Sequence, residues 1–496
     1  MPINNISQNS PAKQDFINII ILFAIALCMG IFLIITTVVV SKDSTVFIQY
    51  AKDLAVSPSQ TMIQQAQHPG YPALILAAAK ITGLFYHGDQ LFLFIYSAQA
   101  VSLLFRILTI VVLYFLGKEL IGTRFSFWAV LILIMLPKPA EYGSDALSDW
   151  PNLFFLTAGM LSLFYGAKYG KWWLFAITGL AGGLAYLIRP EGAQVIIYGI
   201  WWLILQLFWK NRTLSKSRAA IGLASMIFIF LIIVSPYMKL KGAIFPKKNL
   251  GTFSSLQQSN DKDIQHSLNS NDFYAGIVPS EVGKAVFTIF ENTGDTLMWF
   301  FLLPYIIGVL LFFKKKKFLE PEQFFIIALI ILNVPLMIWL YCSHGYMSGR
   351  HTLTLIVFTI FFIPPGLQAM SAWLNTKYSK GFQHTHRWFA ILMTIGIVIC
   401  IPKLFTSLHS DKLIYRSASN WLKKYTEKDA LIAVPDYRIS FYAERKGLDY
   451  NQETMNDEVR YIVAKPDIEQ SLPKKTLLIS LEDKSSKRKL NIYRRD

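Results

Sequence analysis

The chain alternates between long apolar stretches and short polar segments rich in lysine and arginine. A helix needs about 20 mainly apolar residues to cross a bilayer, and by that measure the pattern predicts about eleven membrane-spanning helices. The shorter apolar stretch 71–86 predicts a juxtamembrane or re-entrant helix instead. The expected spans are residues 16–40, 91–117, 123–139, 147–167, 172–188, 193–209, 219–236, 295–313, 323–342, 351–370 and 388–406.

Composition supports a membrane protein. Only 16% of the 496 residues are charged and the mean hydropathy is +0.40, whereas soluble domains carry about 25% charged residues. The net charge of +17 is compatible with a nucleic-acid binder. The basic residues nevertheless cluster at the ends of the apolar stretches, where membrane topology places them. We therefore expect the lipid bilayer, and no nucleic acid, as a partner.

The distribution of basic residues predicts the orientation. With the N-terminus in the cytoplasm, every inner loop carries lysine or arginine, as the positive-inside rule requires. Counting 71–86 as a span would break this agreement. We expect a multi-pass protein of the cell (inner or plasma) membrane. The basic residues of the inner loops are Lys118, Arg124, Lys168, Lys171, Lys210, Arg212, Lys216, Arg218, Lys314 to Lys317, Lys377, Lys380 and Arg387.

Three long segments then fall outside the cytoplasm: the loops 41–90 and 237–294, and everything after residue 407. The last segment is polar, with a helical stretch at 418–425 and short strand-like runs at 431–434, 461–464 and 476–480. Such a mixture predicts a small α/β domain. The expected architecture is an all-α polytopic membrane domain over 1–407 and an extracytoplasmic α/β domain over 408–496.

The first outer loop opens with Asp43, directly after the first span. A carboxylate at the membrane edge is more desolvated than one in open water, which favours a role as a base. The alternative is an acid in the first turn of a helix. The same loop holds His68-Pro69-Gly70-Tyr71-Pro72, which leads into the short apolar stretch.

Further polar residues gather at other outer span ends. Asp145 and Asp149 are four residues apart and would share one face of a helix. Three roles are open for them: a base, a cation site, or acids at the start of a helix, where the helix dipole favours them. The segments Arg189-Pro190-Glu191-Gly192 and Tyr346 to His351 each place an arginine where a lipid phosphate would lie. A guanidinium binds oxyanions with two parallel hydrogen bonds. The alternatives are a turn with an Arg–Glu pair and a snorkelling arginine beside an interfacial tyrosine.

Arg106 falls near the middle of the span 91–117. A charge at that depth is expected to pair with an acid or to line a cavity. A transporter would use it in an ion pathway, although the sequence shows no internal repeat of the kind common in transporters. A non-catalytic scaffold that presents the outer domain is the other alternative.

In order and spacing, these segments resemble the integral-membrane glycosyltransferases of the GT-C fold. The resemblance covers about residues 40–370 and is closest to the bacterial branch related to protein O-mannosyltransferases and lipid A aminoarabinose transferases. Asp43-Ser44 departs from the frequent Asp-Glu of this family, which leaves use of a divalent metal open. The matching motifs are Asp43, Tyr50-Ala51, His68 to Pro72, Tyr114 to Lys118, Pro137, Leu147-Ser148-Asp149, Arg189 to Gly192 and Gly349-Arg350-His351.

The resemblance implies transfer of a sugar from a polyprenyl-phosphate carrier to an acceptor outside the cytoplasm, with inversion at the anomeric carbon. Asp43 would be the base, and Arg350, with Arg189, would bind the phosphate. Asp149 would position donor or acceptor; the sugar and the acceptor, whether lipid, glycan or protein, stay open. The other expected site residues are Tyr346 and His351 beside the phosphate, and His68, Tyr71, Asp145 and Glu191 in the loops that contact substrate.

Overall fold

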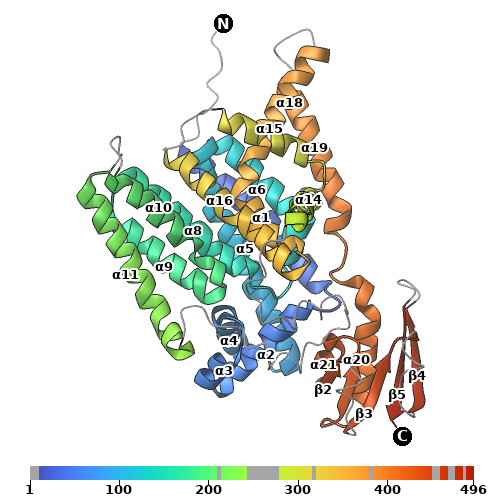
Figure 1. Cartoon of the computed structure of the whole chain (residues 1–496). Helices are drawn as coiled ribbons and strands as arrows, with labels where there is room; N and C mark the ends of the chain where they lie inside the picture. Colours follow the sequence, from blue (N-terminus) through green and yellow to red (C-terminus); the bar gives the residue numbers. More distant parts are fainter. Residues whose placement is uncertain are drawn as a thin grey trace.

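A computed structural model describes residues 11–208, 214–242, 279–314, 320–378, 385–449, 458–466, 475–483 and 488–495. A large helical part precedes a small C-terminal sheet (Figure 1). The expected loop 237–294 and several inner loops lie partly outside the described residues. The α-helices of the large part are α1 (Pro11–Ile35), α2 (Lys42–Val56), α3 (Pro58–Gln64), α4 (Gly70–Thr82), α5 (Gln90–Ile121), α6 (Thr123–Met135), α7 (Pro137–Tyr142), α8 (Asp149–Tyr169), α9 (Trp172–Ile188), α10 (Gln194–Phe208), α11 (Lys216–Lys241), α14 (Pro279–Thr296), α15 (Leu302–Phe313), α16 (Pro321–His344), α17 (Leu353–Thr359), α18 (Ile363–Tyr378) and α19 (Thr385–Leu404). Short 3₁₀ helices are η1 (Pro190–Ala193), η2 (Gly349–Thr352), η3 (Ile360–Phe362) and η5 (Ser410–Lys412).

Every predicted span overlaps a helix, and the protein is a multi-pass membrane protein. Seven of the described helices or helical runs are long and apolar enough to cross a membrane, and α4, α6, α9 and α15 are shorter apolar helices. The count of eleven is therefore not confirmed. Helix α6 ends at Met135 instead of continuing to 139, because the residue before Pro137 is disfavoured in the helical conformation. The stretch at 71–86 is the short helix α4, as expected.

The first helix ends at Ile35, five residues earlier than predicted. The next five residues, Thr-Thr-Val-Val-Val, are all β-branched, and such side chains lower helix propensity. The hydroxyl groups of Thr36 and Thr37 donate hydrogen bonds to the last carbonyls of the helix, those of Phe32 and Leu33. Residues 36–41, here called the connector, therefore run in a non-helical conformation to α2.

Two ion pairs and a hydrogen bond gather the expected inner loops at one end of the helical part. Lys118 contacts Asp15, Lys168 contacts Glu119, and Arg124 contacts His386. The opposite end carries α2, α3 and α4 together with the C-terminal sheet (Figure 1). The structure thus places the two sets of loops at opposite ends of the helical part, as the charge pattern predicts.

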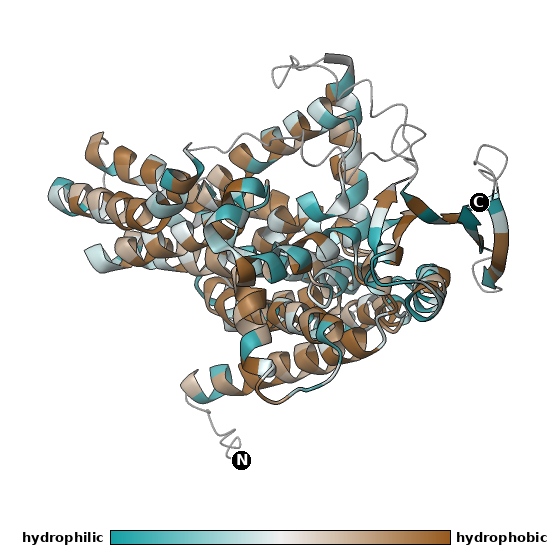
Figure 2. Cartoon of the chain, turned by 90° about the horizontal axis from the view of Figure 1, so that it is seen from below, coloured by the Kyte–Doolittle hydropathy of each residue, from teal (hydrophilic) through white to brown (hydrophobic). Residues whose placement is uncertain are grey.

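The outer surfaces of the long helices are apolar. Large side chains such as Phe23, Leu104, Leu231 and Ile331 are exposed on four different helices, and hydrophobic residues extend along most of the helical part (Figure 2). In a soluble protein such a surface would be an interaction site or an aggregation hazard. Contact with lipid tails explains it here.

The C-terminal part is the predicted small α/β domain. Its sheet has the order β2-β1-β3-β5-β4; β1 pairs in parallel with β2 and β3, whereas β5 is antiparallel to β3 and β4. Helix α20 (Leu413–Tyr425) packs on the sheet through apolar side chains at four-residue spacing, those of Ile414, Ala418 and Leu422. Its elements are α20 (Leu413–Tyr425), β1 (Leu431–Val434), α21 (Tyr437–Ala443), β2 (Lys446–Asp449), β3 (Val459–Ala464), β4 (Lys475–Asp483) and β5 (Arg488–Arg495).

Candidate active site

Segments far apart in the sequence meet at the end of the helical part that carries α2 to α4. Arg350 of η2 forms an ion pair with Asp43 of α2, and its Nη1 lies 4.0 Å from Asp149 Oδ2. Arg189, which follows α9, places Nη1 2.6 Å from Asp149 Oδ1 and Nε 2.6 Å from Glu191 Oε1. These five residues, here called the charge cluster, form an unbroken series of alternating acids and arginines.

Local sequence explains how each member reaches the cluster. Ser41 caps α2 by accepting a hydrogen bond from the Ser44 amide, so Asp43 lies in the first helical turn. Asp149 is the first residue of α8, where the helix dipole favours an acid. A Cβ atom on Gly192 would overlap the backbone of Ala185. The glycine therefore lets η1 pack tightly against α9, which brings Arg189 and Glu191 back toward Asp149.

The two aspartates of the cluster differ in exposure. The side chain of Asp43 is 46% exposed, whereas that of Asp149 is 6% exposed. Among the described residues no group donates a hydrogen bond to Asp149 Oδ2. A buried carboxylate oxygen without a hydrogen-bond donor destabilises the folded protein, so Asp149 Oδ2 is well placed to accept a hydrogen bond from a bound hydroxyl group. Asp43 is the carboxylate that an incoming molecule reaches first.

Two expected phosphate ligands lie beside the cluster without joining it. Tyr346 is 61% exposed in the turn after α16. His351 follows Arg350 in η2 and places Nδ1 3.0 Å from the Ser348 carbonyl oxygen. Neither residue has an ion pair or hydrogen bond to the cluster in the described structure.

His68 and Tyr71 have packing roles in the structure, and their contact with substrate stays a prediction. His68 is buried between the rings of Tyr186 and Tyr237, and its Nδ1 donates to the Tyr186 carbonyl oxygen at 2.6 Å. Burial lowers the pKa of His68, which favours the neutral ring. Tyr71 is fully buried and donates to the Ala98 carbonyl oxygen at 3.1 Å. Both residues thus fix α4 against neighbouring helices.

Asp145 does not share a helical face with Asp149, because α8 begins only at Asp149. Its buried carboxylate instead accepts hydrogen bonds from the amides of Ser41 and Ala146 and from His409 Nε2 at 3.1 Å. Burial alone raises the pKa of Asp145, but the hydrogen bonds and charge of His409 and the amides outweigh it and hold that pKa below its usual range. Asp145 is therefore an ionised anchor next to the cluster.

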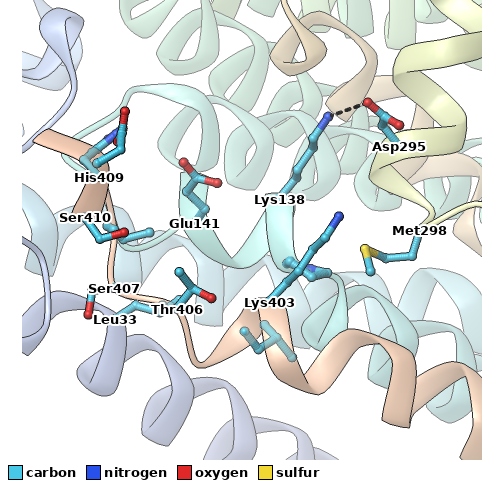
Figure 3. A pocket seen from close by; sticks show the side chains of 14 residues that line it. Leu33, Lys138, Glu141, Asp295, Met298, Lys403, Thr406, Ser407, His409 and Ser410 are labelled. Atoms are coloured by element: carbon cyan, nitrogen blue, oxygen red, sulfur yellow. Dashed lines mark ion pairs between the residues drawn. The ribbon is translucent and has the colours of Figure 1, made fainter. Parts of the chain in front are cut away.

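A cavity of about 360 Å³ is lined by α7, the end of α19 and the linker 406–411 (Figure 3), and no residue of the charge cluster is among its lining residues. Lys138, Glu141, Lys403 and His409 contribute to its walls. A Cβ atom on Gly349 would lie 3.6 Å from Lys138 Nζ, so the loop of Arg350 adjoins it. Sequence reasoning missed Lys138. The sequence feature that could have identified it is its position between two prolines at the outer end of a predicted span, where the positive-inside rule does not expect a lysine.

Arg106 has no acidic partner among its described contacts. It is fully buried, donates to the Ile134 carbonyl oxygen at 3.0 Å and lies 5.9 Å from the Trp150 ring. The expectation of an acid is therefore wrong, and a backbone carbonyl and an aromatic face take its place. The cavity described above is not lined by Arg106, so an ion pathway through this residue gains no support.

Within the described ranges no three histidine, cysteine, aspartate or glutamate side chains are grouped as metal ligands. In the charge cluster the arginines occupy the positions between the carboxylates.

Comparison with known proteins identifies the fold. A family model described as dolichyl-phosphate-mannose-protein mannosyltransferase matches residues 72–238. The crystal structure of ArnT from Cupriavidus metallidurans bound to undecaprenyl phosphate is similar, with a TM-score of 0.61 and 12% identity over 96% of this chain and 97% of that chain.

The archaeal oligosaccharyltransferase AglB from Archaeoglobus fulgidus, in complex with an inhibitory peptide and a dolichol-phosphate, is also similar. Its TM-score is 0.56 at 11% identity, over 92% of this chain and 70% of that chain. A search of the curated proteins finds no match. The chain therefore has the GT-C fold, as the sequence resemblance predicted.

Proposed function

We propose that this GT-C protein is a membrane glycosyltransferase that moves a sugar from a polyprenyl-phosphate carrier to an acceptor hydroxyl group on the extracytoplasmic side. The observation that carries the proposal is the ion-paired contact of Asp43, Arg350 and Asp149, which come from three distant segments. Two structures of similar fold contain polyprenyl phosphates, which supports the choice of carrier.

The ion pair between Asp43 and Arg350 suggests how the base becomes available. The phosphate of the carrier is an oxyanion, and a guanidinium binds it with charge-assisted hydrogen bonds. When the phosphate takes the place of the carboxylate on Arg350, Asp43 loses its partner and is free to accept a proton. Donor binding would thus precede activation of the acceptor.

The reaction is a single displacement. Asp43 accepts the proton of the acceptor hydroxyl group while the oxygen of that hydroxyl group attacks the anomeric carbon. The bond between that carbon and the phosphate oxygen breaks, and the polyprenyl phosphate leaves with the bonding electrons. Arg350, supported by Arg189, stabilises the charge that develops on the leaving phosphate, and Asp149 Oδ2 accepts a hydrogen bond from a sugar hydroxyl group.

The purified full-length protein in nanodiscs is the appropriate test system. Polyprenyl phosphates carrying different radiolabelled sugars are supplied together with an envelope extract as the source of acceptor. We expect the wild type to move label from the polyprenyl phosphate to another molecule of the extract, separated by thin-layer chromatography or gel electrophoresis, and Asp43→Asn to leave the label on the polyprenyl phosphate. Label that moves only from a nucleotide sugar, or from none of the lipid-linked sugars, would overturn the proposal.

A further inference from the structure

The connector that leads to Asp43 is held from outside the helical part. The Val40 amide donates to the Tyr442 hydroxyl group at 2.9 Å, and the Val38 amide donates to the Leu408 carbonyl oxygen at 3.1 Å. Tyr442 belongs to α21 of the C-terminal domain, and Leu408 to the linker before it. Val40 is fully buried, so water does not replace the Tyr442 hydroxyl group as the acceptor of its amide.

A second anchor acts one residue further on. The Ser41 amide, at the N-cap of α2, donates to both oxygens of the Asp145 carboxylate, and His409 Nε2 lies 3.1 Å from Oδ2 of the same group. Ser44 also donates to Asp145, at 3.1 Å. The two residues on either side of Lys42-Asp43 are thus bonded to the same carboxylate.

His409 has an unusual backbone. Its φ of +53° lies in the left-handed region, which residues other than glycine seldom adopt, although asparagine, aspartate and histidine do so more often than the rest. Strained residues of this kind persist where the surrounding structure over-determines them. In this conformation His409 contacts Asp145, which in turn accepts hydrogen bonds from Ser41 and Ser44 at the start of α2.

We propose that Tyr442, His409 and Asp145 are positioning residues, through which the C-terminal domain sets the location of Asp43. The catalytic consequence rests on the proposed function, in which Asp43 is the base. Proximity effects are steep, since a displacement of about 1 Å can lower a rate about a hundredfold. None of the three residues has a direct contact with the guanidinium groups of Arg350 or Arg189 in the described structure, so they act through the backbone.

Tyr442→Phe is the sharpest variant, because it removes only the oxygen that accepts from Val40. Tyr461→Phe is the matched control, since its hydroxyl group donates to Glu427 within the same domain. Hydrogen exchange of the full-length protein in nanodiscs should accelerate in the peptide covering 38–44 for Tyr442→Phe and not for Tyr461→Phe. Unchanged exchange in this peptide would overturn the positioning role, whether or not the protein transfers sugar.

Kinetics then test the catalytic consequence. We expect Tyr442→Phe to lower kcat about 10- to 100-fold with little change in the KM for donor, while Tyr461→Phe matches the wild type. His409→Gln keeps a donor for Asp145 and should retain more activity than His409→Leu. Faster exchange with an unchanged kcat would overturn the link to catalysis. A wild type without transfer activity would count against the proposed function, and the exchange result would still decide the positioning role.

Discussion

Replacing Asp43 by Asn is the most direct test of the site. The substitution keeps the size of the side chain and one oxygen that accepts a hydrogen bond from Arg350, but it removes the negative charge and the basicity. Loss of a general base lowers a rate about 10²- to 10⁴-fold, which corresponds to about 2.7–5.4 kcal/mol of transition-state stabilisation. We expect kcat to fall within this range.

The geometry also predicts the effect on donor binding. In the wild type, Asp43 and the donor phosphate compete for Arg350, because the carboxylate occupies the guanidinium in the absence of substrate. The asparagine side chain of the variant is a weaker competitor, since a neutral amide lacks the charge that strengthens such hydrogen bonds. The KM for donor should therefore stay constant or fall while kcat drops, and a fall in KM is a result that loss of folded protein would not produce.

The assay is transfer from a labelled lipid-linked sugar by the purified variant in nanodiscs, with gel filtration to show that it is folded. Asp53→Asn is a matched control, because Asp53 lies on the same helix and its side chain accepts a hydrogen bond only from Gln49 among the described residues. A kcat near that of the wild type in folded Asp43→Asn would refute the assignment of the base, and Asp149 would then be the better choice.

Three further outcomes follow from the structure. Arg350→Ala should raise the KM for donor about 10- to 100-fold, the range for losing charged hydrogen bonds, and Arg350→Lys should recover only part because the planar fork is lost; normal donor use by both variants would place the phosphate elsewhere. Burial alone lowers the pKa of His409, but its hydrogen bond to Asp145 outweighs this and raises that pKa above 6.5. The pair therefore stabilises fully below pH 6.5 and is lost as pH rises through the raised pKa, so the difference in melting temperature between wild type and His409→Gln should shrink from about pH 6 to about pH 9; a constant difference would contradict the charge pair. In a cysteine-free background, Lys428→Cys should react with an impermeant reagent in intact cells and Lys314→Cys only after lysis, and the reverse pattern would invert the topology.

Much of the helical part was predictable from the sequence, because a bilayer imposes long apolar helices and a charge difference between the two sides. The failures lie where single residues decide a helix end. The run of β-branched residues after Ile35 and the proline at 137 each shorten a predicted span, although hydropathy alone continues through both. In the C-terminal domain, β2 and β5 went unpredicted because Lys446–Asp449 and Arg488–Arg495 are too polar to resemble strands, and pairing with neighbours forms them.

The site was predictable in part. Arginines and acids at outer span ends were identified because charge at the edge of a membrane is conspicuous, and Asp43, Asp149, Arg189, Glu191 and Arg350 do meet. Their pairing was not predictable, since it depends on the packing of segments up to about 300 residues apart. The hydrogen bonds of His68 and Tyr71 to backbone carbonyls were not predictable either, because such a bond leaves no trace in a sequence.

The contacts of the connector also determine when the site becomes complete. The acceptor for the Val40 amide lies 402 residues later in the chain, and at about 5–20 residues per second the ribosome needs roughly 20–80 s to reach it. During that interval α1 and α2 are already made, but the connector lacks Tyr442, and until residue 350 is made Asp43 lacks Arg350 as well. An unfinished chain therefore has no assembled site until α21 has been made.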